Sequence, residues 1–140
     1  MADFREAFLQ GLAAYEEAEQ ARKEIFGLLD EFAEQVHQAS NGRVRIERTS
    51  VKAREKLPLA SDYHNREYEA IVALGSSGDE REELCEYSLA ERGYPVTLRY
   101  AKEDVRCHDG QALERGLQKL LAHPQTGGKL RRLLEGAQAA

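Results

Sequence analysis

The chain has 140 residues and a formal net charge of −5, with 41% hydrophobic and 32% charged residues. This composition is typical of one globular domain, here expected over residues 1–140, that can bury a core without a metal or disulfide staple. No apolar run is long enough to span a membrane, the first residues lack the pattern of a signal peptide, and two cysteines are too few for a secreted disulfide framework. We therefore expect a cytoplasmic protein.

Apolar residues recur every seven positions along residues 4–39, which is the spacing of a helix seam. Asn41-Gly42 is a helix stop signal. At about 1.5 Å per residue the helix would be roughly 50 Å long, whereas a domain of this size is only about 30 Å across. The helix should therefore break near Gly11 or Gly27, or pack its free end on a partner. The simpler interpretation is that this helix covers one face of a sheet. The alternative is a dimer interface, for which the candidate residues are Phe8, Tyr15, Ile25, Leu29 and Phe32.

Three segments have strand patterns. Residues 43–49 alternate between charged and apolar side chains, as in an edge strand. Residues 69–75 contain an unbroken apolar run, which suits a strand covered on both faces. Residues 96–101 alternate again. The connection 50–67 shows no obvious structure, and its polar groups Asp62, His64 and Glu67 are a candidate acid–base site.

A helix is predicted near residues 79–92, between the second and third strands. Ser77 and Glu80 have the spacing of a capping box, and Arg92-Gly93 resembles a helix end. Strand, helix and strand would form a βαβ unit with parallel strands. The alternative is a strand over 83–90 in a hairpin with 96–101, because Cys85, Tyr87 and Leu89 also alternate.

Two further helices are predicted near 110–122 and 129–135, the first capped by Asp109 and ended by His123-Pro124. The expected fold class is α/β, with α+β as the alternative. The core, over residues 43–135, would be a small mixed sheet of three to four strands with helices on both faces.

In a sheet with parallel strands, ligands bind beyond the carboxyl ends of those strands. The candidate ligand edge here consists of Ser76, Ser77, Asp79, Lys102, Asp104, Arg106 and His108. The Gly75–Gly78 loop could hold a phosphate, although it lacks the spacing of known phosphate-binding motifs. Adjacent side chains of an extended segment point to opposite sides, so Cys107 and His108 are expected to be a buried thiol and an exposed imidazole. We expect no cofactor and no metal site.

Charge is segregated along the chain. Residues 1–42 contain 3 basic and 9 acidic groups, and residues 43–56 contain 6 basic and 2 acidic groups. We expect a non-enzymatic interaction or regulatory protein of the inhibitor, immunity or adaptor type, with a basic protein partner or a homodimer through the first helix. One alternative is a phosphate- or nucleotide-binding enzyme that uses the Gly75–Gly78 loop. A weaker one is nucleic-acid binding through 43–56, which is disfavoured because no aromatic residue interleaves the basic ones.

Overall fold

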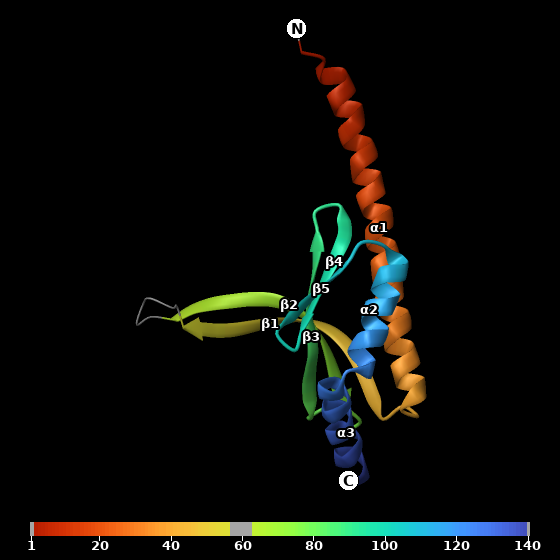
Figure 1. Cartoon of the computed structure of the whole chain (residues 1–140), viewed down its shortest axis with the longest axis vertical. Helices are drawn as coiled ribbons and strands as arrows, with labels where there is room; N and C mark the ends of the chain where they lie inside the picture. Colours follow the sequence, from red (N-terminus) through yellow and green to blue (C-terminus); the bar gives the residue numbers. More distant parts are fainter. Residues whose placement is uncertain (1, 57–62, 140) are drawn as a thin grey trace.

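One long helix runs alongside the sheet, and its N-terminal part extends past the rest of the molecule (Figure 1). The structure is a computed structural model that describes residues 2–56 and 63–139. Helix α1 (Phe4–Ala39) is continuous over 36 residues. The carboxylate of Asp3 caps its first turn. Directly after the helix, Asn41 and Gly42 have left-handed backbone conformations, with φ of 55° and 78°. The predicted helix is confirmed, and of the two alternatives for its length, the break near Gly11 or Gly27 does not occur.

The sheet contains five strands, which are β1 (Val44–Lys56), β2 (Tyr63–Gly75), β3 (Arg81–Ala90), β4 (Gly93–Tyr100) and β5 (Glu103–Cys107). They follow one another in the order β1-β2-β3-β4-β5, and each neighbouring pair is antiparallel. The fold is therefore a mixed α+β fold with an open antiparallel sheet. The predicted parallel pairing and the count of three to four strands are wrong. The predicted antiparallel pairing of the first strand with 69–75 is confirmed.

The predicted helix near 79–92 is wrong, because β3 occupies this segment. Ser77 does accept a hydrogen bond from the N–H of Asp79 at 3.4 Å, but this bond closes a turn between two strands. Gly78 enters that turn with φ of 78° and donates its N–H to the carbonyl of Gly75. Gly93, with φ of 96°, follows a tight turn from β3 into β4. The residues that resembled two helix caps in the sequence therefore lie in two hairpin turns.

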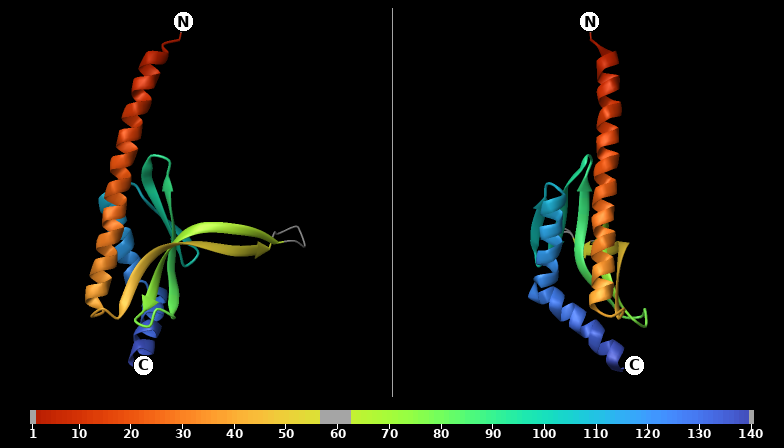
Figure 2. Two further views of the ribbon diagram at one scale, coloured as in Figure 1. Left: turned by 180° about the vertical axis from the view of Figure 1, so that it is seen from behind. Right: turned by 90° about the vertical axis from the view of Figure 1, so that its right-hand side faces the viewer.

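Strands β1 and β2 form a long hairpin whose distal part projects from the body (Figures 1 and 2). We call this part, residues 50–56 paired with residues 63–69, the arm. The segment 50–67 was expected to have no regular structure, and most of its described residues belong to this arm. Strand β5 was also not predicted. Its pattern is weak because only Val105 and Cys107 face the core.

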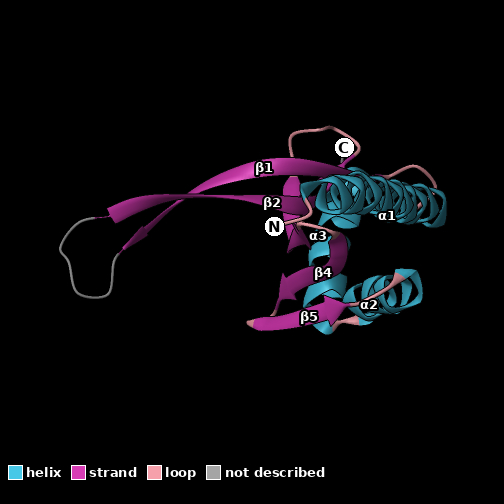
Figure 3. Cartoon of the chain, turned by 90° about the horizontal axis from the view of Figure 1, so that it is seen from above, coloured by secondary structure: helices cyan, strands magenta, loops and turns pink. Residues whose placement is uncertain are grey.

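Helices α2 (Gly110–Ala122) and α3 (Pro124–Ala139) complete the fold. The helix predicted near 110–122 is confirmed, and the one predicted near 129–135 begins earlier, at Pro124, where proline is tolerated in a first helical turn. All three helices contribute to one core with one face of the sheet; examples are Ile25 of α1, Leu113 of α2 and Leu133 of α3. Figure 3 shows α1 and α2 on the same side of the strands. The expectation that helices cover both faces is wrong, since the opposite face of the sheet is open.

Candidate functional site

The N-terminal part of α1 extends beyond the sheet and the other helices (Figures 1 and 2). We call residues 4–17 the overhang. Its limit is the turn between β3 and β4, where Ala18 is buried and Gly93 lies close to Ala21. At about 1.5 Å per residue the overhang is roughly 21 Å long.

Five large apolar side chains of the overhang are exposed. Their exposed fractions are 79% for Phe4, 66% for Phe8, 57% for Leu9, 51% for Leu12 and 63% for Tyr15. They are the large hydrophobic side chains that stand out as exposed in the described part of the chain. Taking roughly 200 Å² for each fully exposed residue, together they present about 600 Å² to solvent. Contiguous apolar patches of this size on a monomer are often interaction sites.

Four of these residues form one stripe along the helix. At about 100° per residue, Phe4, Phe8, Leu12 and Tyr15 lie within roughly 80° of one another around the axis. Residues of the seven-residue seam drift by about 20° per heptad in a straight helix. The seam therefore faces the core at Val36 and has turned by about 80° at Phe8. Leu9 lies beside them, about 60° from Leu12 around the axis, and we call all five residues, Phe4, Phe8, Leu9, Leu12 and Tyr15, the apolar stripe.

The structure divides the predicted interface residues into two groups. Phe8 and Tyr15 are exposed, as an interface requires. Ile25, Leu29 and Phe32 are buried in the core at 0%, 3% and 8% exposure, so they are not accessible to a partner in this fold. Sequence reasoning also left Phe4, Leu9 and Leu12 out of the list, although these are apolar residues in the same segment.

The predicted ligand edge is not assembled at one place. Ser76, Ser77 and Asp79 lie in the turn from β2 to β3, and Lys102 lies in the turn from β4 to β5. The register places Tyr100 beside the pair of Cys85 with Ile71, four residues before the end of β2 at Gly75. At about 3.3 Å per residue, the two turns are offset by roughly 13 Å along the strands.

The remaining residues of that edge follow the second turn. Asp104 and Arg106 lie on β5, where Asp104 pairs with Arg99 at 3.5 Å, and His108 is exposed beyond the strand. The parallel strands that were expected to bring the two groups together are absent. The loop Gly75–Gly78 precedes a strand, so its N–H groups do not gain the field of a helix terminus.

The second candidate site, in the connection, is described only in part. Asp62 and the side chain of His64 lie outside the described residues. Glu67 accepts a hydrogen bond from the hydroxyl of Ser50 across the arm, at 3.0 Å. Nothing in the described part of the arm gathers acid and base groups around a cavity.

Both thiols are buried and protonated. Burial raises the pKa of Cys85 to about 12, and burial, followed by the charge of Asp109, also raises the pKa of Cys107. Neither is therefore activated as a nucleophile. Among the described residues, no group of three or more His, Cys, Asp or Glu side chains is placed to hold a metal ion.

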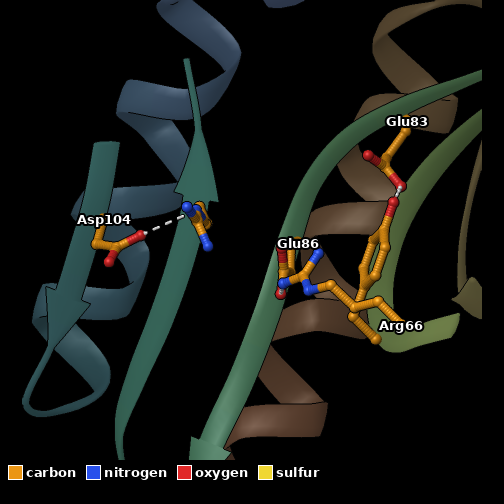
Figure 4. Close-up of polar contacts among 6 residues, drawn as sticks. Arg66, Glu83, Glu86 and Asp104 are labelled. Carbon is orange, nitrogen blue, oxygen red and sulfur yellow. Dashed lines mark hydrogen bonds and ion pairs between the residues drawn. The ribbon is translucent and has the colours of Figure 1, made fainter. Parts of the chain in front are cut away.

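The open face of the sheet carries a polar network rather than a pocket (Figure 4). Tyr68 donates a hydrogen bond to Glu83 at 2.8 Å, and Arg66 pairs with Glu86 and lies 4.5 Å from the ring of Tyr68. Burial, followed by the bond to Glu83, raises the pKa of Tyr68 to about 12, which keeps its hydroxyl protonated as a donor. These groups satisfy one another, as expected of a solvated sheet face.

The basic segment 43–56 is partly engaged within the chain. Arg48 forms an ion pair with Asp30 at 3.1 Å and lies 4.7 Å from the ring of Phe26. Arg45 pairs with Glu47 at 3.0 Å. Both arginines are thus partly neutralised by neighbouring carboxylates, which weakens the case for phosphate binding here.

A shallow groove of about 370 Å³ runs between α1 and α2. Apolar side chains such as Leu28 and Leu121 line its floor, and Glu31 and Glu114 lie on its rim. It contains no histidine, cysteine or basic residue among its lining groups. Its chemistry is that of a contact surface between helices.

Comparison of the chain with protein-family models, with curated proteins and with solved structures gave no match. In the described residues, no helix has the length and apolar character needed to cross a membrane. The most distinctive feature on the surface is therefore the apolar stripe of the overhang. What this arrangement can do is bind another apolar surface.

Proposed function

We propose that this chain is a non-enzymatic protein-interaction module of the regulatory type, and that the apolar stripe is its binding surface. The single observation that carries this proposal is the exposure of Phe4, Phe8, Leu9, Leu12 and Tyr15 on a helix segment beyond the fold. Burying a large apolar side chain contributes about 1.5–3 kcal/mol, so a partner that covers the stripe gains a substantial driving force. Catalysis finds less support, because the titratable groups singled out in the sequence are dispersed or buried.

A second property of the overhang supports the proposal. A segment of about 14 residues is a marginal helix in water, and Gly11 lowers its helix propensity by about 1 kcal/mol relative to alanine. The fold holds one end of this segment in helical form through α1. A partner helix or groove would supply the packing that the segment lacks at its other end.

Site-specific photo-crosslinking in the full-length chain tests this function. A benzophenone side chain in place of Leu12 is expected to give a discrete adduct with a protein in cells that produce the chain. The matched control places the same group at Gln10, which is exposed on the opposite side of the helix, and should give no such adduct. Adding Phe8→Glu to the Leu12 variant should abolish the adduct. Equal labelling from both positions, or none from Leu12, would contradict the proposal.

A further inference from the structure

We infer that the partner of the apolar stripe is a second copy of this chain, bound antiparallel, overhang against overhang. This inference rests on the proposed function and names its partner. The first supporting observation is the surface area that the two overhangs could bury against each other. At roughly 200 Å² for a fully exposed residue, Phe4, Phe8, Leu12 and Tyr15 expose about 500 Å² in each overhang, so a symmetric pair that covered them would bury about 1,000 Å², near the lower end of specific interfaces.

The seven-residue pattern of the stripe is self-complementary when two overhangs run in opposite directions. In antiparallel coiled coils each position of one series faces a position of the companion series. The stripe then places Phe4 of one copy opposite Tyr15 of the other, and Phe8 opposite Gly11. Apart from its chain neighbours and the backbone of its own helix, no atom of the chain lies within 4 Å of where a side chain on Gly11 would begin. The space beside Gly11 is therefore open, and the ring of Phe8 from the second copy can occupy it.

The length of the overhang favours the same orientation. Antiparallel pairing over residues 4–15 uses only the uncovered segment and stops before Ala18, which the fold already buries. The two globular bodies then lie at opposite ends of the helix pair. Parallel pairing would bring both bodies to the same end, where the β3–β4 hairpin already lies against α1 near Ala21 (Figure 2).

Charge also distinguishes the two orientations. Antiparallel pairing puts Arg5 of one copy within about two residues, roughly 3 Å of rise, of the level of Glu16 of the other, twice in the dimer. It also opposes the two helix dipoles. Parallel pairing would instead align the two helix dipoles and put Arg5 at the level of Arg5 of the other copy. Exposed ion pairs add little affinity, but they select orientation.

Sedimentation of the purified full-length chain tests the partner. We expect a monomer–dimer equilibrium between about 1 and about 100 µM, with dimer predominating at the upper end. Phe8→Glu and Leu12→Glu should each weaken the dimer by at least about 100-fold, because each change acts twice in the symmetric pair. Gln10→Glu, on the opposite side of the same segment, should leave dimerisation unchanged. Circular dichroism should report an intact fold for all three variants, since none of these residues lies in the core.

Orientation is tested by pairing single cysteines across the dimer. Chains carrying Ala7→Cys and Ala14→Cys should crosslink when mixed, because these positions lie on the same flank of the stripe and within about two residues of the same level in the antiparallel pair. Ala2→Cys alone should not crosslink, since its two copies would be about 22 Å apart along the axis. Self-crosslinking of the Ala2→Cys chain would overturn the antiparallel arrangement.

The outcomes separate the two proposals. A chain that remains monomeric at about 100 µM, or a dimer that Phe8→Glu and Leu12→Glu leave intact, overturns the second copy as partner. If the Leu12 photo-adduct then contains a different protein, the proposed interaction function stands without it. If there is neither a dimer nor an adduct, both proposals fail.

Discussion

Ile25→Ala is expected to lower the free energy of unfolding by about 3–4 kcal/mol, whereas Phe8→Ala on the same helix should change it by less than about 0.5 kcal/mol. Ile25 is fully buried where α1 packs on the sheet, and its truncation leaves a cavity. Phe8 is 66% exposed on the overhang, so its removal costs the isolated fold little. Urea unfolding measured at about 1 µM protein, where a dimer would dissociate, provides both values.

The comparison tests the division of α1 into a structural part and a binding part. A large loss of stability for Phe8→Ala in dilute protein would mean that the overhang packs within its own chain. A small loss for Ile25→Ala would mean that α1 contributes little to the core. The first result would remove the basis for treating residues 4–17 as a free surface, and the second would remove the assignment of the rest of α1 to the core.

Gly93→Ala is expected to destabilise the fold by about 2–4 kcal/mol. A side chain at this position would begin 2.7 Å from the Cβ of Ala21, and the backbone has φ of 96°, which L-residues rarely adopt. This close approach locks the β3–β4 hairpin against α1 at the limit of the overhang. Thermal unfolding of the purified variant measures the effect.

Gly27→Ala is the matched control. Gly27 lies in the middle of α1, and apart from its chain neighbours and the backbone of its own helix no atom lies within 4 Å of an added Cβ. The change should stabilise the protein by up to about 1 kcal/mol through helix propensity. A Gly93→Ala variant as stable as Gly27→Ala would show that the hairpin does not dock against the helix in this way.

The helices were predictable because their signals are local. The capping group Asp109, the stop at Asn41-Gly42 and the apolar periodicity all lie within or directly beside the helices they define. Sequence alone could not indicate how far the sheet extends along α1. It therefore could not separate the buried Ile25 from the exposed Phe8, which occupy the same repeat.

Strand β3 was assigned to a helix for a physical reason. A bulge opposite Ile71 and Val72 interrupts its pairing, so the adjacent residues Leu84 and Cys85 are both buried. Two successive buried residues spoil the alternation that identifies a strand. The turns on either side contain serine, glycine and acidic residues, which also occur in helix caps.

The strand 69–75 was expected to be buried between helices on both faces. Its residues are buried, but helices lie on only one face. Ala70 and Val72 are at most 2% exposed, yet they face the open side of the sheet, where Glu86 and Glu83 are their neighbours in register. On this face, residues of the neighbouring strands rather than a helix lie beside Ala70 and Val72. An unbroken apolar run therefore indicates burial, but does not specify which element provides it.

The outer arm and β5 have little apolar character because they bury little. In the arm, Lys52 pairs in register with Glu67, and Arg54 with Asn65. Such pairs give no hydrophobic period to detect. The prediction of a ligand edge depended on parallel strands. It fails because all neighbouring strands of the sheet are antiparallel.

Hydrogen exchange of the unmodified full-length chain at two concentrations tests the role of the overhang most directly. We predict that the backbone amides of residues 8–17 exchange much more slowly at about 100 µM than at about 1 µM, while those of residues 25–36 stay protected at both. The first result would mean that a second molecule covers the stripe. Rapid exchange of residues 8–17 at the same rate in both samples would contradict the account.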